Sequence, residues 1–343
     1  MLSFFIFQDM RNNNNHKTIG LTFDLKEDYR LKKGDPVDRY AEFDVKATID
    51  IVKKAIEDNG HKVLPLGDIK SLLNLRGRPQ VDIVFNLAEG ELGRNRESQV
   101  PMFLEFLQLP FVGGDALTLG ISLDKIMTKK IFIAEGIPTP AFFQANNASD
   151  LGTMKLKYPL IVKPRFEGSS KGVNQESLIY DFSNLKKRVK WLIETYQQSA
   201  LIEEFIMGKE FTVPIIGNDK PTVYCPVQIK IDGKLKLGDL FYTFERITSD
   251  KLEYIYPAKI NKALTERIRK LALAAYQAVE CRDFGRVDFR VNEKNEIFVL
   301  EVNPLPSLST DDVFMKIAEY DGLKFSDVIG EILRSAFKRY NWN

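Results

Sequence analysis

The chain has 343 residues, of which 44% are hydrophobic and 28% are charged, so it can bury a large core and is expected to form two or three domains. Its 49 Lys and Arg residues nearly balance its 47 Asp and Glu residues, which gives no electrostatic reason to expect binding to nucleic acid or to a membrane surface. Two Cys and two His exclude a disulfide scaffold, argue against a zinc site and fit a reduced cytoplasmic setting.

The N-terminal segment MLSFFIFQDM is apolar, but it lacks the basic leader and the small-residue cleavage site of an export signal. The NNNN tract that follows is predicted to be a surface turn. No run reaches the length of about 20 apolar residues that spans a bilayer. We therefore expect a cytoplasmic protein without a membrane segment.

The first third of the chain alternates predicted strands and helices. Helices are predicted over residues 42–59 and near SQVPMFLEFLQ, and the predicted strands are TIGLTFDL, HKVLPL, VDIVFNL and LPFVGG. This alternation predicts a parallel sheet built from βαβ units. No GxGxxG follows the first strand and no GxxxxGK[ST] occurs anywhere, so a phosphate-binding site must come from another part of the chain.

Two later segments carry lysines beside predicted anion-binding features. A helix is predicted over 122–136, with Ser122 as its N-cap, and Lys125 lies in its first turn, where the helix dipole disfavours a cation unless an anion is near. The segment YPLIVKPRFEGSSKGV predicts a strand that ends at Lys163, followed by a Gly-Ser loop. Backbone N–H groups of such a loop, with Lys163 and Lys171, can bind phosphate oxygens.

The segment SALIEEFIMGKEFTVPII predicts two strands about a turn at Gly208. Glu203, Glu204 and Glu210 lie among its apolar residues, and such acceptors suit an adenine amino group or ribose hydroxyls. A surface hairpin is the alternative interpretation.

The segment GRVDFRVNEKNEIFVLEVNPLPSLS, residues 285–309, predicts a β-hairpin. Its antiparallel register would place Asp288 opposite Glu301 and Arg286 opposite Asn303, on one face. Like charges directly opposite each other are destabilising unless a cation lies between them. A solvated face with a cross-strand salt bridge is the alternative.

The register rests on pairing Asn292 with Ile297, which would also put Ile297 and Val299 on the same face as Glu301. Carboxylate and amide oxygens without His or Cys are ligands for Mg²⁺ or Mn²⁺ rather than zinc. Mg²⁺ bound by so few protein oxygens usually carries nucleotide phosphates, so the hairpin points to a nucleotide site.

Taken in order, the helix with Lys125, KPRFEGSSKGV, LIEEFIMGKEFTV and the hairpin resemble the successive signatures of the ATP-grasp superfamily. Within it, the chain from about Val81 to its C-terminus most resembles D-alanine–D-alanine ligases. The resemblance implies an α/β protein with the ATP-grasp fold. An N-terminal parallel-sheet (pre-ATP-grasp) domain, 1–120, would precede two α+β subdomains, 121–208 and 209–343, that enclose ATP.

The resemblance also implies an ATP-dependent ligase that joins a small-molecule carboxylate to an amine through an acyl phosphate. The groups expected at the ATP phosphates are Lys125, Lys163, Ser169 and Ser170. Those expected around the adenine and ribose are Glu203, Glu204, Ile206 and Glu210. Those expected to bind two Mg²⁺ or Mn²⁺ ions are Asp288, Glu301 and Asn303. Those expected to act in catalysis are Arg286, Ser169 and Lys163. The family also suggests a homodimer formed through the N-terminal domain.

The chain departs from the family pattern at several loops. TIGLTFDLKEDY lacks the Ser-Ala-Glu segment that helps to hold the first amino acid. In LAEGELGRNRE, Glu89 replaces the family's histidine. ERITSDKLEY puts Arg246 and Ile247 where the family has a Lys-Tyr pair near ATP. SLSTDD puts Asp312 where the family has a serine near the second substrate's carboxylate, and an aspartate would repel that carboxylate.

We therefore expect intact ATP machinery and an altered substrate site. Arg94 or Arg96 would meet a substrate carboxylate and Asp311 or Asp312 a substrate amine, with helix caps and surface charges as the alternative for each. Backbone donors near Ser307 would help Arg286 to hold the oxyanion. A true D-alanine–D-alanine ligase of peptidoglycan synthesis with diverged loops, and a non-catalytic ATP-binding regulator, remain as alternative functions.

Overall fold

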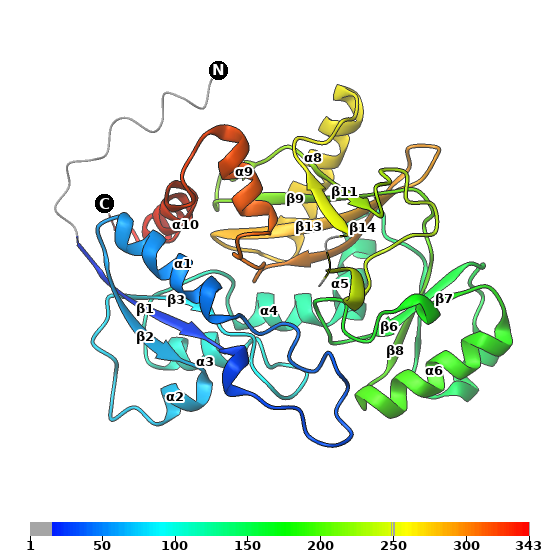
Figure 1. Cartoon of the computed structure of the whole chain (residues 1–343), viewed down its shortest axis with the longest axis horizontal. Helices are drawn as coiled ribbons and strands as arrows, with labels where there is room; N and C mark the ends of the chain where they lie inside the picture. The colour runs from blue at the N-terminus through cyan, green and yellow to red at the C-terminus, as the bar shows by residue number, and fades with distance from the viewer. Residues whose placement is uncertain (1–15, 248, 250, 343) are drawn as a thin grey trace.

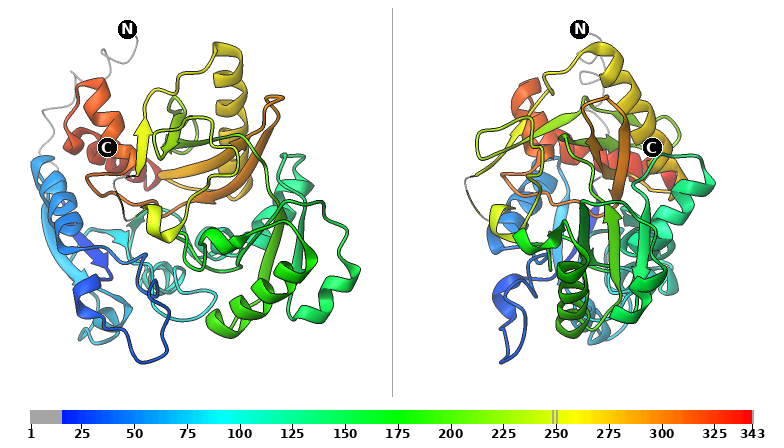
Figure 2. Two further views of the ribbon diagram at one scale, coloured as in Figure 1. Left: turned by 45° about the vertical axis from the view of Figure 1, so that its right-hand side comes forward. Right: turned by 90° about the vertical axis from the view of Figure 1, so that its right-hand side faces the viewer.

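The computed structural model describes residues 16–247, 249 and 251–342. The predictions made for MLSFFIFQDM and for the NNNN tract lie outside the described residues. Three β-sheets make up the framework of the described chain, and they surround a central region from three sides (Figure 1; Figure 2). This α/β arrangement confirms the predicted fold class.

The first sheet is parallel, as predicted, with the strand order β2-β1-β3-β4. Its strands are β1 (Thr18–Phe23), β2 (Lys62–Gly67), β3 (Ile83–Leu87) and β4 (Phe111–Val112). Its helices are α1 (Lys46–Asp58), α2 (Ile69–Leu73) and α3 (Gln99–Phe106). The helix predicted over 42–59 begins only at Lys46, because Val45 is extended and serves as the N-cap. Residues 42–44 therefore precede the helix as part of a loop, and this loop faces the centre of the molecule.

The second sheet is antiparallel, with the order β5-β8-β6-β7, and α6 packs against it. The elements of this region are α4 (Ala116–Leu123), α5 (Lys125–Ala134), β5 (Phe142–Ala145), β6 (Leu160–Pro164), β7 (Leu178–Ile179), α6 (Phe182–Tyr196) and β8 (Ala200–Glu204). The predicted N-cap at Ser122 is wrong, since Ser122 belongs to α4. Asp124 caps α5 instead, and its side chain accepts a hydrogen bond from the Met127 N–H group.

The third sheet is also antiparallel along β12-β11-β9-β13-β14, with β10 paired to β9. Its elements are β9 (Lys209–Ile216), β10 (Thr222–Val223), β11 (Val227–Ile231), β12 (Leu252–Ile255), β13 (Phe284–Val291), β14 (Ile297–Asn303) and the covering helix α8 (Lys262–Ala278). The two strands predicted about Gly208 are present as β8 and β9. They belong to different sheets, so the alternative of a simple surface hairpin is wrong.

The hairpin of β13 and β14 has the predicted register at its functional end and a different one at its turn. Asp288 pairs with Glu301, but Val291, not Asn292, pairs with Ile297. A bulge at Leu300 absorbs the difference of one residue. Val299 therefore packs in the core, contrary to the prediction that it shares a face with Glu301.

The C-terminal helices α9 (Val313–Asp321) and α10 (Phe325–Arg339) return to the first sheet. α10 lies beside α1 (Figure 1), and both helices share one buried core with β1 and β3. The three sheets fall within the predicted segments 1–120, 121–208 and 209–343, although α9 and α10 complete the core of the first. The boundaries themselves stay a prediction.

The remaining helical elements are the short η2 (Lys26–Asp28), η3 (Ala148–Thr153), η4 (Gln175–Ser177) and α7 (Phe244–Ile247). In the described part of the chain, no helix combines the length and the apolar character needed to cross a bilayer.

Candidate active site

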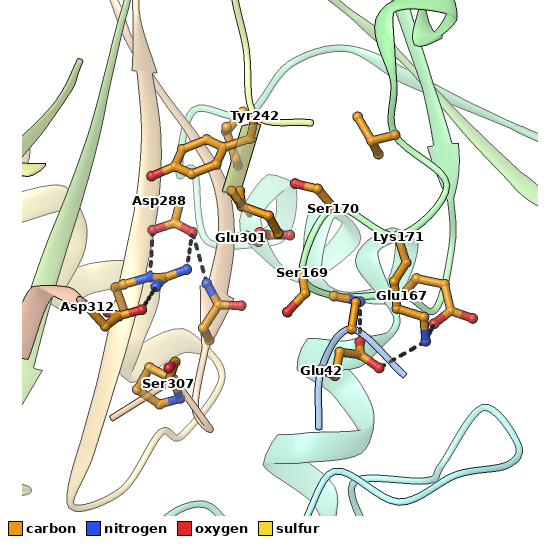
Figure 3. Close-up of a pocket in the computed structure, with 18 of the residues that line it drawn as sticks. Glu42, Glu167, Ser169, Ser170, Lys171, Tyr242, Asp288, Glu301, Ser307 and Asp312 are labelled. Atoms are coloured by element: carbon orange, nitrogen blue, oxygen red, sulfur yellow. Dashed lines mark hydrogen bonds and ion pairs between the residues drawn. The ribbon is translucent and has the colours of Figure 1, made fainter. Parts of the chain in front are cut away.

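A cavity of about 1150 Å³ lies where the three sheets meet. It brings together most of the residues singled out from the sequence. The predicted residues that line it are Glu89, Lys125, Lys163, Ser169, Ser170, Lys171, Glu203, Glu204, Ile206, Glu210, Arg286, Asp288, Glu301, Asn303, Ser307, Asp311 and Asp312. Figure 3 shows Asp288 and Asp312 on one side of this cavity and Ser169, Ser170 and Lys171 on the other.

The hairpin places four polar side chains together on one face, as predicted, and we refer to them as the polar square: Arg286, Asp288, Glu301 and Asn303. Asp288 pairs with Glu301 and Arg286 with Asn303 across β13 and β14. The Asn303 side chain donates to Asp288 at 2.9 Å, and the Arg286 guanidinium donates to both Asp288 oxygens at 3.1 and 3.2 Å. The Thr212 hydroxyl also donates to Asp288, at 2.5 Å. These contacts hold the Asp288 carboxylate in the cavity wall.

The donor set of this square fits Mg²⁺ or Mn²⁺ carried by a nucleotide. Asp288 and Glu301 supply carboxylate oxygens and Asn303 an amide oxygen, which are hard ligands. Among the described residues, no group of three or more His, Cys, Asp or Glu side chains could hold a metal ion alone. An ion here would therefore need phosphate oxygens and water to complete its coordination, as Mg²⁺ with a nucleotide does.

Lys125 lies at the start of α5, beside the end of β6. Its backbone N–H group donates to the Arg165 carbonyl oxygen at 3.2 Å, and the Arg165 guanidinium binds both oxygens of the N-cap Asp124 at 2.6 Å. Its ammonium group lies 2.6 Å from Glu301. Burial opposes ionisation of Glu301, but Lys125 and then Lys163 lower its pKa to about 2. Two lysines predicted to bind phosphate thus already face the predicted metal site.

Glu203 is buried between the ammonium groups of Lys163 and Lys129. Burial would raise the pKa of Glu203, but these two cations hold it below its ordinary value. Lys129 was missed in the sequence, although its position one turn after Lys125 on the same helix was a usable signal. The nearby Glu210 pairs with Arg290 at 2.8 Å, and burial raises its pKa to about 7.

The Gly-Ser loop is fixed to the N-terminal domain. Ser169 and Ser170 both have left-handed backbone angles, with φ of 45° and 55°. The Gly168 N–H group donates to Glu42 at 2.5 Å, and the Lys171 ammonium donates to the same carboxylate at 3.0 Å. The Gly172 N–H group donates to Asp38 at 2.7 Å. The loop is thus already folded over one side of the cavity.

Lys171 was expected to add charge to a phosphate site, but its ammonium group pairs with Glu42 and Glu167 instead. Arg94 and Arg96, expected at a substrate carboxylate, do not line the cavity. Arg96 is buried, and its Nη2 donates to both Glu42 oxygens at 2.7 and 2.9 Å. The placement of these three side chains does not support the predicted anion contacts.

Arg94 is 59% exposed and pairs with Asp124 at 3.2 Å. Arg246, expected near ATP, is buried outside the cavity lining, where its Nη1 donates to the Phe241 carbonyl oxygen at 2.9 Å. Both guanidinium groups therefore have structural partners within the chain.

Asp312 lines the cavity and caps α9. One of its oxygens accepts from the Val313 N–H group at 2.6 Å, and the other lies 3.5 Å from the Arg286 guanidinium. The interpretation of Asp312 as a helix cap is therefore correct. Its contact with Arg286 also keeps it beside the predicted reaction centre.

Several cavity residues were not found from the sequence. TIGLTFDLKEDY does lack a Ser-Ala-Glu segment, but Ala41 and Glu42 occur later, directly before α1, and both line the cavity. A glutamate just upstream of the first helix was the available signal. Other acidic and tyrosine side chains that line the cavity include Asp44, Glu97, Tyr242 and Tyr254. Of these, Glu97, in the RNRES run, and Tyr254, at the end of ERITSDKLEY, lay near residues already under consideration.

Comparison with known proteins agrees with this geometry. The family described as D-ala D-ala ligase C-terminus matches residues 132–334. An uncharacterised protein, y4sG, from Sinorhizobium fredii is 33% identical over 302 residues, which cover 86% of this chain and 88% of that protein. A D-alanine–D-alanine ligase from Carboxydothermus hydrogenoformans is 33% identical over 298 residues, which cover 83% of this chain and 91% of that enzyme.

The solved structure of the VanG D-Ala:D-Ser ligase from Enterococcus faecalis has the same fold. Its TM-score is 0.73 at 21% identity, and the match covers 94% of this chain and all of that chain. Fold and relatives together define an ATP-grasp enzyme, an ATP-dependent ligase that forms a bond between a carboxylate and an amine. The chain belongs to the D-alanine–D-alanine ligase family, as its sequence signatures indicated.

Proposed function

We propose that this ligase activates a carboxylate as an acyl phosphate with ATP and then transfers the acyl group to an amine. The observation that supports this most is the convergence of Asp288, Glu301 and Asn303 with Lys125 and Arg286 on one cavity. Metal-binding oxygens, phosphate-binding ammonium groups and a guanidinium are the groups that phosphoryl transfer to a carboxylate requires.

ATP would lie between the second and third sheets. Its phosphates would contact Lys125 and Lys163, with Ser169, Ser170 and the backbone of their loop above them. The adenine and ribose contacts would come from Glu203, Glu204, the backbone at Ile206, and Glu210. The left-handed backbone of both loop serines supports this role, because consecutive N–H groups in that conformation can converge on an anion.

Asp288, Glu301 and Asn303 would hold one or two Mg²⁺ or Mn²⁺ ions. When bound, such ions neutralise charge that develops on the transferred phosphoryl group. The neighbouring side chains of the protein orient these metal-binding groups. Thr212 and Asn303 fix Asp288 by hydrogen bonds, and Lys125 fixes Glu301.

In the first step, a carboxylate oxygen of the acid substrate forms a bond to the γ-phosphorus, and the bond from that phosphorus to ADP breaks. In the second step, the amine forms a bond to the acyl carbon, phosphate leaves, and the nitrogen loses a proton. Arg286 would orient the carboxylate first and then stabilise the oxyanion of the tetrahedral intermediate, with backbone N–H groups near Ser307.

The identity of the substrates is the second part of the proposal. The relatives named D-alanine–D-alanine ligases favour D-alanine in both positions. Asp312 and Glu89 in the cavity, however, place carboxyl groups, which do not bind a substrate carboxylate as the family's serine and histidine positions would, near the expected amino acid sites. We therefore propose an acid and an amine other than two D-alanines. Efficient turnover with D-alanine alone would overturn that part.

The activity is tested by ADP release with a panel of acids, using hydroxylamine as a small amine that needs no binding site of its own. Hydroxamate formation together with ADP release would support the acyl phosphate route. If no acid gives ADP release under these conditions while ATP still binds, the alternative of a non-catalytic ATP-binding regulator is supported instead.

A homodimer formed through the N-terminal domain and a cytoplasmic location also stay proposals. Light scattering of the purified protein, and fractionation of cells that express it, are the respective tests.

A further inference from the structure

A long loop extends from the first sheet to the region of the second sheet. Residues 24–45 connect β1 to α1 and contain the short η2. Connections of this kind usually have about 2–6 residues, and much longer ones in compact domains are often functional. We refer to residues 24–45 as the β1–α1 loop. In Figure 1 this loop is drawn in blue and reaches towards α6.

Asp38 is the residue at which the β1–α1 loop meets the end of α6. It is only 5% exposed, although Val37 and residues 30–34 are exposed. Its two oxygens lie 2.9 and 2.8 Å from the Tyr196 hydroxyl, which donates to them, and one oxygen also accepts from the Gly172 N–H group at 2.7 Å. Both donors are neutral, so they offset the cost of burying a carboxylate less than a cation would.

Gly172, which ends the Gly-Ser loop, is held from several sides at once. Its N–H group donates to Asp38, and its carbonyl oxygen accepts from Nη2 of the buried Arg188 on α6 at 2.6 Å. Gly172 has a φ of 71°, and an added Cβ atom would lie 2.5 Å from Pro164 and 3.1 Å from the Tyr196 ring. These contacts leave the backbone of Gly172 little freedom to move.

The position of Gly172 determines the position of the two loop serines. The Val173 N–H group donates to the Ser170 carbonyl oxygen at 3.0 Å, so Gly172 lies inside a turn that includes Ser170. Figure 3 shows Ser169 and Ser170 across the cavity from Asp288. A displacement of Gly172 would therefore move the backbone N–H groups that we expect at the ATP phosphates.

The Gly-Ser loop is attached to the N-terminal domain at two points. Glu42 accepts from the Gly168 N–H group at one end, and Asp38 accepts from the Gly172 N–H group at the other. One attachment would let the loop rotate, whereas two fix its orientation. Glu42 lines the cavity, but Asp38 and Tyr196 do not, so these two side chains can act on bound ATP only through the loop.

We propose that Asp38 is a positioning residue of the ligase: together with Tyr196, it fixes Gly172 so that the Gly-Ser loop covers the ATP phosphates during phosphoryl transfer. This inference rests on the proposed function and adds to it a role for two residues outside the cavity. A fixed loop keeps its N–H donors oriented where charge develops and excludes water from the acyl phosphate. If the loop were loosened, water would attack the acyl phosphate, which returns the acid and releases phosphate.

The kinetic test compares ADP release with hydroxamate formation, using ATP, Mg²⁺, hydroxylamine and an acid that forms a hydroxamate. In Asp38→Ala and in Tyr196→Phe we expect kcat to fall about tenfold, less hydroxamate to form per ADP, and the KM for the acid to change little. Asp38→Asn keeps an oxygen that can accept from the Gly172 N–H group, so its kcat should lie between those of Asp38→Ala and the wild type. Asp28→Asn, exposed in the same loop, is the control.

Urea unfolding and circular dichroism separate positioning from a purely structural role. Tyr196→Phe keeps the ring that packs against Gly172 and Trp191, so we expect it to stay folded. Wild-type kcat and wild-type hydroxamate per ADP in both Asp38→Ala and Tyr196→Phe would overturn the inference, whatever the change in stability. The ligase function would then remain intact.

Limited proteolysis tests the inference without turnover. Lys171 is 7% exposed, so trypsin can cleave after it only when the Gly-Ser loop leaves its place. We expect this cleavage, located by mass spectrometry, to be about tenfold faster in Asp38→Ala than in the wild type or Asp28→Asn. A non-hydrolysable ATP analogue with Mg²⁺ should slow it. Equal cleavage rates in all three proteins would contradict the inference, even if no acid were found to react.

Discussion

Lys125 and Glu301 form an ion pair of 2.6 Å that joins the first residue of α5 to β14. The contact links a group predicted to bind phosphate with a group predicted to bind metal. Glu301 accepts from Lys125 while its neighbour Asp288 is held by Arg286. Each carboxylate of the predicted metal pair thus has its own cation, which relieves the repulsion between them.

Replacing Lys125 by Met should weaken ATP binding. A charge-assisted hydrogen bond contributes roughly 1.5–3 kcal/mol, so the KM for ATP should rise about 10- to 100-fold. Initial rates of ADP release at varied ATP measure this. Lys130→Met, on the exposed side of the same helix, is the control and should keep the wild-type KM. A normal KM in Lys125→Met would remove Lys125 from the phosphate site.

Replacing Asp288 by Asn should abolish the metal dependence of turnover. The metal is expected to contribute several kcal/mol to the transition state, which corresponds to roughly a 10³-fold loss of kcat. ADP release is measured over a Mg²⁺ titration, and nucleotide binding by fluorescence. Asp219→Asn, whose side chain is 81% exposed, is the control. Full activity of Asp288→Asn, or wild-type activity in EDTA, would refute the metal assignment.

Replacing Glu42 by Gln should destabilise the protein and loosen the Gly-Ser loop. It would leave Arg96 and Lys171 buried without their shared carboxylate, and breaking such a pair costs about 3–5 kcal/mol. Urea unfolding measures the loss at neutral pH. Glu57→Gln, at a half-exposed site on α1, should change stability by less than about 0.5 kcal/mol.

The stability due to Glu42 should depend on pH in a defined direction. Burial opposes its ionisation, but Arg96 and Lys171 lower its pKa from 4.5 to about 2. A carboxyl group whose pKa falls on folding stabilises the protein above its unfolded pKa. The difference in unfolding free energy between wild type and Glu42→Gln should therefore be full above pH 4.5 and shrink as the pH falls towards 2. A constant difference over this range would contradict the ion-pair explanation.

Replacing Gly208 by Ala should disturb the link between β8 and β9. Gly208 has a φ of 149°, and an added Cβ atom would lie 2.1 Å from the Val291 carbonyl oxygen. Backbone strain of this kind costs about 1–3 kcal/mol. We expect a lower unfolding midpoint and a higher KM for ATP, because the link orders the expected adenine-binding strand end. Gly152→Ala has no neighbour within 4 Å and should behave as wild type in both measurements.

Local patterns predicted the hairpin because alternation and a polar turn determine which residues oppose each other at its functional end. They did not predict the bulge at Leu300, since a single extra residue leaves no mark in the alternation of apolar side chains. Val299 was consequently assigned to the face of Glu301, whereas it packs in the core of the third sheet.

The partners of charged side chains were harder to predict in loops than in strands. Arg96 was expected to face a substrate, but its guanidinium binds Glu42, which lies 54 residues earlier in the chain. The sequence contains no sign of that pairing, because it depends on how the loop before α1 meets the Gly-Ser loop. Glu42 was missed although a glutamate just upstream of the first helix was a usable signal, because the sequence does not show that this loop reaches the cavity.

The placement of α9 and α10 has a consequence for how this protein is made. β1 and β3 are synthesised early, yet Phe314, Ile329 and Leu333 fill the same core. On the ribosome, the first sheet and α1 would wait with part of their shared apolar surface uncovered until the last part of the chain emerges. We expect nascent chains that stop before Val313 to need chaperones and to be degraded rapidly, although every residue of the first sheet is already present.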